Sequence, residues 1–273
     1  MPFHNFSAQI RAAKLEASSL INCSKPILPV DICYIAKLLG YSVDEAYIPW
    51  SGYLPEGQNV IIVRRTDSLE RKRFTIAHEI GHILWGKISQ ENPMTSRTRH
   101  KNASPDEERI ADQLAVELLM PEKEFQDEMS KRKRPSLADI VVIARLFAVS
   151  FESCLRRITE LPEFVAFTYL YSMNVDKSGT YEISFREGYS SKPQLTFATP
   201  PLGIILNCIQ HILRAHTAWE GHLRLRRGDQ EFQIPSVGGV VIKNKQPSVR
   251  LIGWRNLNNP ICYSINRNQL VSF

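Results

Sequence analysis

The fold of this chain depends on the stretch Arg73-Phe74-Thr75-Ile76-Ala77-His78-Glu79-Ile80-Gly81-His82-Ile83-Leu84. It contains the pattern H-E-x-x-H, and residues four apart lie on one face of an α-helix. His78 and His82 can therefore direct two imidazole rings at one point. The flanking positions are mostly apolar, which indicates a buried helix, and polar side chains inside such a helix need partners.

Two imidazoles at this spacing suit Zn²⁺, which takes nitrogen ligands at about 2.0–2.1 Å. Glu79 is displaced around the helix from the histidines, so it can reach a water on the metal without binding the metal itself, as the general base of a metalloprotease must. The same pattern also occurs by chance in unrelated proteins, where the two histidines are structural. A catalytic zinc site needs a third protein ligand from elsewhere in the chain.

A second helix is predicted over residues 106–121, where apolar residues recur at helical spacing. Ser104-Pro105 is typical of an N-cap followed by proline in the first turn, and Pro121 suits the helix end.

This second helix carries the candidate third ligand. Glu108 and Asp112 lie four residues apart beside its apolar stripe. We predict that Glu108 binds the zinc and that Asp112 accepts a hydrogen bond from the outer N–H of one histidine. Two alternatives stay open. Glu107, Glu108 and Asp112 can be solvated first-turn charges favoured by the helix dipole, which is our interpretation of Glu107, and Glu117 can be the ligand instead.

These motifs together resemble the ImmA/IrrE family of zinc metallopeptidases. The resemblance rests on R-F-T-I-A-H-E-I-G-H, on E-x-x-A-D and A-V-E-L-L-M-P further on, and on residues 29–41, which are similar to the opening helix of that family. It is specific over residues 25–125 and extends weakly to about residue 160.

The resemblance implies a zincin-like domain. In it, the residues matching His78, His82 and Glu108 bind zinc and the residue matching Glu79 is the catalytic base. It also implies a substrate, because family members cleave transcriptional repressors, usually helix-turn-helix proteins, and so switch on stress, mobile-element or defence genes.

The composition is that of an ordinary globular protein, and 273 residues are enough for about two domains. No run of about 18 apolar residues spans a membrane, and the first residues lack the pattern of a signal peptide. Five scattered cysteines without a C-x-x-C pair favour a reducing cytoplasm and a packing role, with a redox-sensing cysteine as the alternative.

Around the metal helix we expect a small sheet and two helices. The expected helices are residues 7–22 and 31–39, and the expected strands are residues 41–43, 51–54 and 59–64. An extended peptide substrate can add to an open sheet edge, and we expect the segment Ser51–Leu54 to supply that edge. Residues 87–106 read as a loop, whose His100 is either solvated or a resting-state cap on the zinc.

Residues 136–160 have the pattern of a helix-turn-helix, with the turn at 148–150 and a basic run at 131–134 before it. The alternative is two helices that pack under the catalytic domain without contacting DNA. We place a domain boundary at Leu161-Pro162, which gives a metallopeptidase domain over 1–161 and a second domain over 162–273.

The second domain is predicted to be α+β, with a mostly antiparallel sheet and one helix over residues 201–215. Its layout resembles a GAF-like sensor domain, so the whole chain is α+β in class. The expected strands are residues 164–172, 180–186, 222–226, 231–234, 240–243, 249–254 and 261–265, with a hairpin turn at 176–179.

Charge separates the two domains. Residues 1–161 carry 22 basic and 21 acidic side chains, whereas residues 162–273 carry 12 and 7. On the strand 222–226, basic residues alternate with leucines, which places the basic side chains on one face. We predict that this domain binds nucleic acid, specifically single-stranded DNA as an activator, with Trp219 and Trp254 available for stacking. The alternatives are a basic surface without a ligand and a small-molecule pocket, as in other sensor domains. The candidate contact residues are His222, Arg224, Arg226, Arg227, Lys243 and Lys245.

The sequence predicts a cytoplasmic zinc endopeptidase that is regulated through its second domain, and the family resemblance implies that it cleaves a helix-turn-helix repressor. Two alternatives remain: a non-catalytic regulator with a structural zinc that binds DNA or a partner, and a peptidase of general specificity without regulation.

Overall fold

The computed structural model of the whole chain describes residues 3–23, 28–88, 104–132, 137–161, 164–175, 181–190, 196–197, 211, 219–227, 230–243 and 246–256. The chain forms two compact units. The first joins Met1–Arg134 to Ile140–Cys154, and the second joins Pro135–Asp139 to Leu155–Phe273.

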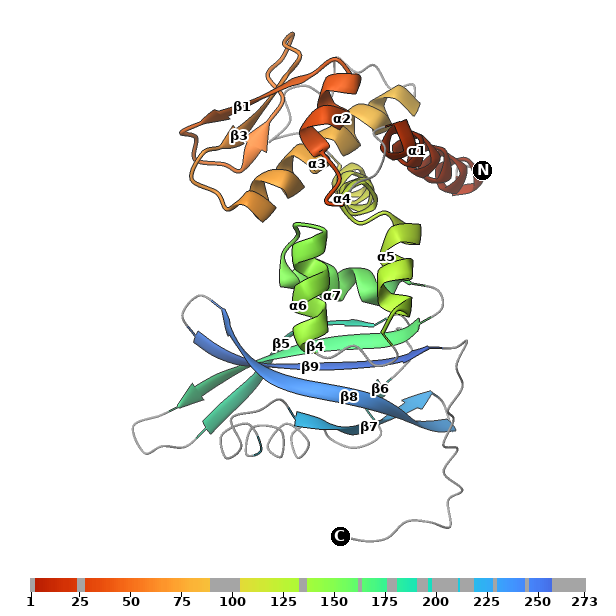
Figure 1. Cartoon of the computed structure of the whole chain (residues 1–273), viewed down its shortest axis with the longest axis vertical. Helices are drawn as coiled ribbons and strands as arrows, with labels where there is room; N and C mark the ends of the chain where they lie inside the picture. The colour runs from red at the N-terminus through yellow and green to blue at the C-terminus, as the bar shows by residue number, and fades with distance from the viewer. Residues whose placement is uncertain are drawn as a thin grey trace, which may run out of the picture. The chain divides into compact units, whose positions relative to one another are not determined.

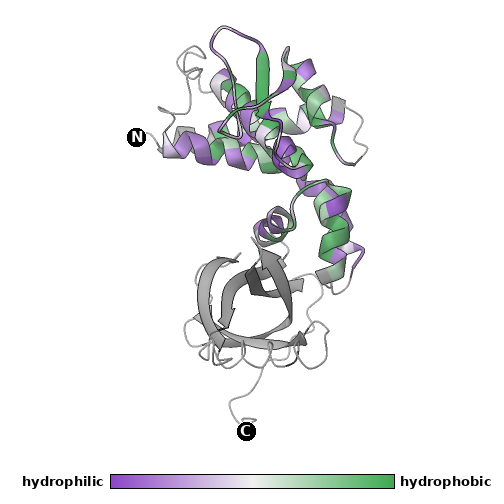
Figure 2. Ribbon diagram, turned by 90° about the vertical axis from the view of Figure 1, so that its left-hand side faces the viewer, coloured by the Kyte–Doolittle hydropathy of each residue, from purple (hydrophilic) through white to green (hydrophobic). Residues whose placement is uncertain are grey.

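The first unit is a helix-rich α+β structure with a small sheet, and this confirms the fold class expected for the N-terminal domain (Figure 1). In chain order its elements are α1 (Phe3–Cys23), α2 (Ile32–Leu38), β1 (Ser42–Ala46), β2 (Gly52–Tyr53), β3 (Val60–Arg64), α3 (Leu69–Ile88), α4 (Pro105–Leu119) and α5 (Glu122–Ser130). Figure 2 shows hydrophobic and hydrophilic residues interleaved along these helices, as expected of helices that bury one face.

The small sheet has the order β1-β3-β2, with β1 parallel and β2 antiparallel to the central strand β3. The predicted edge strand near Ser51–Leu54 is thus confirmed as β2, at one edge of the sheet. The strand β2 packs directly against α3, the helix that carries His78 and His82. A side chain at Gly52 would overlap the Thr75 methyl group of α3 and approach Ile62 O to 2.8 Å.

The core of the first unit lies between α3 and α4. Each helix buries a stripe of aliphatic side chains, which are Ile76, Ile80 and Leu84 on α3 and Ile110, Leu114 and Leu118 on α4. The two backbones approach closely at Gly81, where a Cβ atom would lie only 2.7 Å from Ala111 O and 3.0 Å from Ala111 Cα. Glycine is therefore required at this position for the helices to cross as they do.

The start of α4 is the predicted one. The Ser104 hydroxyl accepts a hydrogen bond from Glu107 N, and Pro105 occupies the first turn. The helix α5 was not predicted from the sequence; it follows Pro121 and buries Phe125 and Met129. Their spacing of four residues is the signal that could have revealed it.

The predicted helical pair consists of α6 (Leu137–Leu146) and α7 (Phe151–Glu160). The intervening turn holds Ala148 at φ 49°, which a non-glycine residue rarely adopts. Arg73 of α3 binds this turn, since its Nε donates to Ala148 O at 3.2 Å and its Nη2 donates to Val30 O at 2.9 Å. The pair thus consists of two helices joined by a tight turn, as the sequence predicted.

In the second unit, six antiparallel strands form one sheet in the order β5-β4-β9-β8-β7-β6. Their bounds are β4 (Phe164–Val175), β5 (Tyr181–Ser190), β6 (Thr196–Phe197), β7 (Trp219–Arg227), β8 (Gln230–Lys243) and β9 (Gln246–Asn256). The expected helix at 201–215 and the expected features at 176–179 and 261–265 lie outside the described residues, His211 excepted.

One strand prediction in this sheet was wrong. Residues 231–234 and 240–243 are not two strands but parts of the single strand β8. Pro235 interrupted the prediction because proline cannot donate to a ladder. In the structure Pro235 pairs only with His222 on β7, and the pairing of β8 with β9 begins one residue later, at Ser236.

Of the cysteines whose side chains the structure describes, Cys154 is buried and Cys33 is exposed. Burial raises the pKa of the Cys154 thiol to about 12, and Cys154 Sγ donates to Ile140 O. Burial and then the Asp31 carboxylate raise the pKa of Cys33. Both cysteines are therefore thiols rather than reactive thiolates at neutral pH, which disfavours the redox-sensing alternative for these two.

Across the described part of the chain, we find no helix with the length and apolar character needed to cross a lipid bilayer.

The contact at Gly81 gives a test of the helix crossing. In a Gly81→Ala variant the new methyl group meets backbone atoms of Ala111, which no side-chain movement can relieve. We expect a loss of about 1–3 kcal/mol in the free energy of unfolding, measured by urea denaturation. Gly86→Ala, five residues on in the same helix, is the control for alanine's own helix propensity. Equal stability of Gly81→Ala and the parent would show that the helices do not cross this closely.

Candidate metal centre

The two histidines of α3 direct the same ring atom at one point. The Nε2 atoms of His78 and His82 lie 3.1 Å apart, and the two rings are nearly perpendicular with their centroids separated by 4.7 Å. His82 is buried and His78 is partly exposed. The helical spacing alone brings them together, as the sequence predicted.

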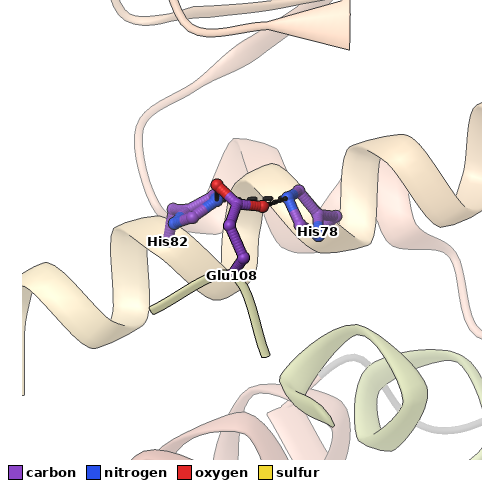
Figure 3. Close-up of side chains that lie close together, drawn as sticks. All are labelled: His78, His82 and Glu108. Atoms are coloured by element: carbon purple, nitrogen blue, oxygen red, sulfur yellow. Dashed lines mark hydrogen bonds and ion pairs between the residues drawn. The ribbon is translucent and has the colours of Figure 1, made fainter. Parts of the chain in front are cut away.

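Glu108 joins them from α4. Its Oε2 lies 3.2 Å from His78 Nε2 and its Oε1 lies 3.5 Å from His82 Nε2. Figure 3 shows the carboxylate of Glu108 lying across both imidazoles. Within the described residues, these three side chains form the one group whose ligand atoms can hold a metal ion together.

The spacing of these donors fits a tetrahedral ion. Bonds of about 2.0–2.1 Å at tetrahedral angles separate two ligand atoms by roughly 3.3 Å. The observed separations among His78, His82 and Glu108 lie on both sides of that value, from 3.1 to 3.5 Å. Two imidazoles and one carboxylate are also a donor set that Zn²⁺ uses in catalytic sites.

A carboxylate lies near the Nδ1 atom of each histidine. Asp112 Oδ1 lies 2.9 Å from His78 Nδ1 and, because a carboxylate only accepts, this bond places the ring proton on Nδ1. The lone pair of Nε2 then faces Glu108 and His82. Glu107 Oε1 lies 3.5 Å from His82 Nδ1, with only 18% of its side chain exposed.

The prediction that Glu107 is a solvated charge was therefore wrong. A helix-dipole argument favours any acid in the first turn of α4 and does not distinguish those that face α3. The rotation of α4 about its axis decides which acids face inward, and that rotation follows from the crossing at Gly81.

The electrostatics of this cluster favour positive charge. Burial lowers the pKa of His78, but the hydrogen bond to Asp112 and the charges of Glu79, Asp112 and Glu108 outweigh burial and raise that pKa above its ordinary value. A site that stabilises an extra proton on an imidazole stabilises a cation of similar position. The acids around the histidines thus prepare the site for a metal ion.

Glu79 lies between the two histidines in sequence and has 5% of its surface exposed. It is not among the three donors. Its charge nevertheless raises the pKa of His78. This arrangement suits a residue that exchanges protons beside the metal without binding it.

The alternative ligand Glu117 lies elsewhere. Its Oε1 accepts a hydrogen bond from Glu122 N at the start of α5. Glu117 is buried because it caps this helix, two and a half turns of α4 away from Glu108. His100, the other residue considered near the metal, is outside the described residues.

Most of the residues predicted to contact nucleic acid lie on described strands, so their backbone positions are known. His222, Arg224 and Arg226 occupy alternate positions of β7, opposite Pro235, Gln233 and Glu231 of β8. Arg227 ends β7 and Lys243 ends β8, while Lys245 lies outside the described residues.

Comparison with known proteins agrees with the geometry of the first unit. A family described as the IrrE N-terminal-like domain matches residues 38–159, which include all the donors of the cluster. Residues 38–159 of this chain therefore match the ImmA/IrrE family. The expected family resemblance is thus confirmed for this part of the chain.

Two individual proteins extend the comparison. The chain is 29% identical over 164 residues to the radiation response metalloprotease IrrE of Deinococcus radiodurans. That match covers 59% of this chain but spans only half the length of IrrE. A solved structure of a Mycobacterium tuberculosis transcriptional regulator matches 90% of this chain and 88% of its own, with a TM-score of 0.57 and 14% identity. At that identity the likeness concerns the fold alone.

The hydrogen bond from His78 to Asp112 can be tested by its effect on the affinity for Zn²⁺. Replacing Asp112 with alanine removes the acceptor that fixes the His78 ring, so we expect affinity for Zn²⁺ to fall about 10–100-fold in a chelator competition assay. Asp106→Ala is the matched control, because Asp106 is an acid of the same helix that pairs with Arg109. Unchanged affinity in Asp112→Ala would rule out the positioning role.

Proposed function

We propose that this protein is a zinc-dependent endopeptidase. The observation that carries the proposal is the cluster of His78, His82 and Glu108, with Glu79 buried beside it. The match of residues 38–159 to the ImmA/IrrE family and similarity to a metalloprotease support the same activity. Zinc is the metal best suited to two imidazoles and a carboxylate.

The chain's own residues supply the proton chemistry. A zinc ion held by His78, His82 and Glu108 would polarise a peptide carbonyl and make a water molecule more acidic. Glu79 accepts a proton from the attacking water and donates it to the departing amine, as one group acting first as base and then as acid. Asp112 keeps the His78 imidazole oriented so that its Nε2 lone pair stays directed at the ion, and the Glu107 carboxylate lies 3.5 Å from Nδ1 of His82.

The proposed substrate is a transcriptional repressor with a helix-turn-helix fold, as the family resemblance implies. β2 supports a protein substrate, because an edge strand lying on the metal helix can pair with an extended peptide segment. A helix-turn-helix repressor is folded, so cleavage requires an exposed or locally unfolded segment.

The rival function is a regulator in which zinc is only structural. A structural zinc has four protein ligands, whereas a catalytic zinc has three and leaves one position for water or substrate. Of the residues that the structure describes, three contribute donors to the cluster, and this favours the enzyme.

Glu79 provides the test that separates these functions. We expect Glu79→Gln to retain bound zinc, because Glu79 is not a donor, and to lower repressor cleavage by about 100-fold or more, because the general base is lost. Zinc content by metal analysis and cleavage by gel electrophoresis are the two measurements. Full activity in Glu79→Gln, or a parent protein that binds no zinc, contradicts the proposal.

We propose further that single-stranded DNA activates the peptidase through the second domain, which we interpret as a GAF-like sensor. The support is the excess of basic residues over 162–273 and the alternation of His222, Arg224 and Arg226 along β7. Phosphate contacts from such residues give binding that weakens steeply with salt. A small ligand or a protein partner is the competing signal.

Activation by DNA is tested by measuring the rate of repressor cleavage with and without short single-stranded oligonucleotides, at low and at moderate salt. We expect oligonucleotides to accelerate cleavage, and the effect to be lost in an Arg224→Glu/Arg226→Glu variant. Arg186→Glu, on the strand β5 at the other edge of the sheet, controls for charge change alone. Equal rates under all conditions, without oligonucleotide binding, would leave another ligand as the signal.

A further inference from the structure

Two side chains on one face of α3, Phe74 and Arg71, extend from the donor cluster, which is the group of His78, His82 and Glu108. The Phe74 ring lies 6.2 Å from the His78 ring, tilted by 32°. The Arg71 guanidinium lies over the same Phe74 ring, 5.8 Å from its centroid. Arg71, Phe74 and His78 thus follow one another at helical spacing, so this face connects the metal site to a fixed positive charge.

Arg71 is fixed by the edge strand. Its Nη2 and Nε donate to Ser51 Oγ at 2.9 and 3.3 Å. Ser51 immediately precedes β2, and its own carbonyl oxygen accepts from Arg64 N at 2.8 Å. The guanidinium is therefore held at the start of the strand that lies on the metal helix, although the residue itself is exposed.

The charge of Arg71 is not neutralised within the described part of the chain. Its neighbour Lys72 pairs with Glu45 at 2.8 Å, and Arg64 pairs with Asp67 at 2.7 Å, but no described carboxylate pairs with Arg71. A guanidinium has five N–H groups, and Ser51 uses two of them. The edge formed by Nη1 and the second Nη2 hydrogen remains available for a bidentate carboxylate.

We propose that Arg71 binds an acidic side chain of the substrate, about three residues from the cleaved bond, and that Phe74 covers the residues between. The inference rests on the proposed peptidase function and names the kind of segment that the peptidase selects. Arg71 and His78 are seven residues apart, which is about 10 Å along the helix. A peptide extended beside β2 advances about 3.3 Å per residue, so the acidic side chain reaches Arg71 three residues from the metal.

The experiment profiles cleavage sites in a library of peptides made by digesting a bacterial proteome. The zinc-loaded full chain is incubated with the library, with and without a single-stranded oligonucleotide, and new termini are identified by mass spectrometry. We expect Asp and Glu to be enriched at one position about three residues from the cleaved bond. Arg71→Gln loses this enrichment, whereas the matched variant Lys72→Gln keeps it, because the charge of Lys72 is paired with Glu45.

Kinetics on one acidic peptide from the library separate binding from a structural effect. We expect Arg71→Gln to raise KM about ten-fold and to leave kcat, zinc content and thermal unfolding near those of the parent. A peptide with Gln in place of its acidic residue should show the same rise in KM with the parent enzyme and none with Arg71→Gln.

Two outcomes overturn the inference, and they are distinguishable from each other. Glu79-dependent cleavage without acidic enrichment, or with enrichment that persists in Arg71→Gln, contradicts the role of Arg71 but leaves the peptidase intact. The absence of any Glu79-dependent cleavage removes the proposed function and the inference together.

Discussion

The contact between the backbones of α3 and α4 at Gly81 and Ala111 is the constraint on which the site depends. With a Cβ atom at position 81 only 2.7 Å from Ala111 O, the helices cannot cross this closely unless that residue is glycine. Gly81 lies between His78 and His82 on α3, and Ala111 follows Glu108 by three residues on α4, so this contact sets the distance from the imidazoles to the carboxylate. A shift of 1 Å would exceed the tolerance of metal–ligand bonds.

The crossing also concentrates negative charge. Glu108 and Asp112 lie beside His78 and Glu107 lies beside His82, and the hydrogen bond to Asp112 together with the charges of Glu79, Asp112 and Glu108 outweighs burial and raises the pKa of His78. Four acids in a partly buried site repel one another unless a cation is present. The same charges that lie beside the histidines thus favour a cation at this position.

What could be predicted from the sequence was the local part of this arrangement. Helical spacing places His78 beside His82, and the Ser104 cap fixes where α4 begins, so the position of Glu108 in the first turn followed from short-range rules. The inward orientation of Glu107 depends on the rotation of α4 against α3, a long-range property. The strand prediction at Pro235 was wrong for a similar reason. Proline has no backbone N–H, so its effect on a strand depends on whether a neighbouring strand needs a hydrogen bond at that residue.

The helix α3 connects three parts of the first unit along its length. Arg73 binds Ala148 O in the turn between α6 and α7, Thr75 packs against the edge strand at Gly52, and His78 follows within one turn of Thr75. Arg73 lies five residues before His78, about 8 Å along a continuous helix. One continuous helix thus carries the contacts to the α6–α7 turn and to the edge strand, together with two of the three metal donors. The packing of the α6–α7 turn, the position of β2 and the geometry of the donors therefore depend on the same helix.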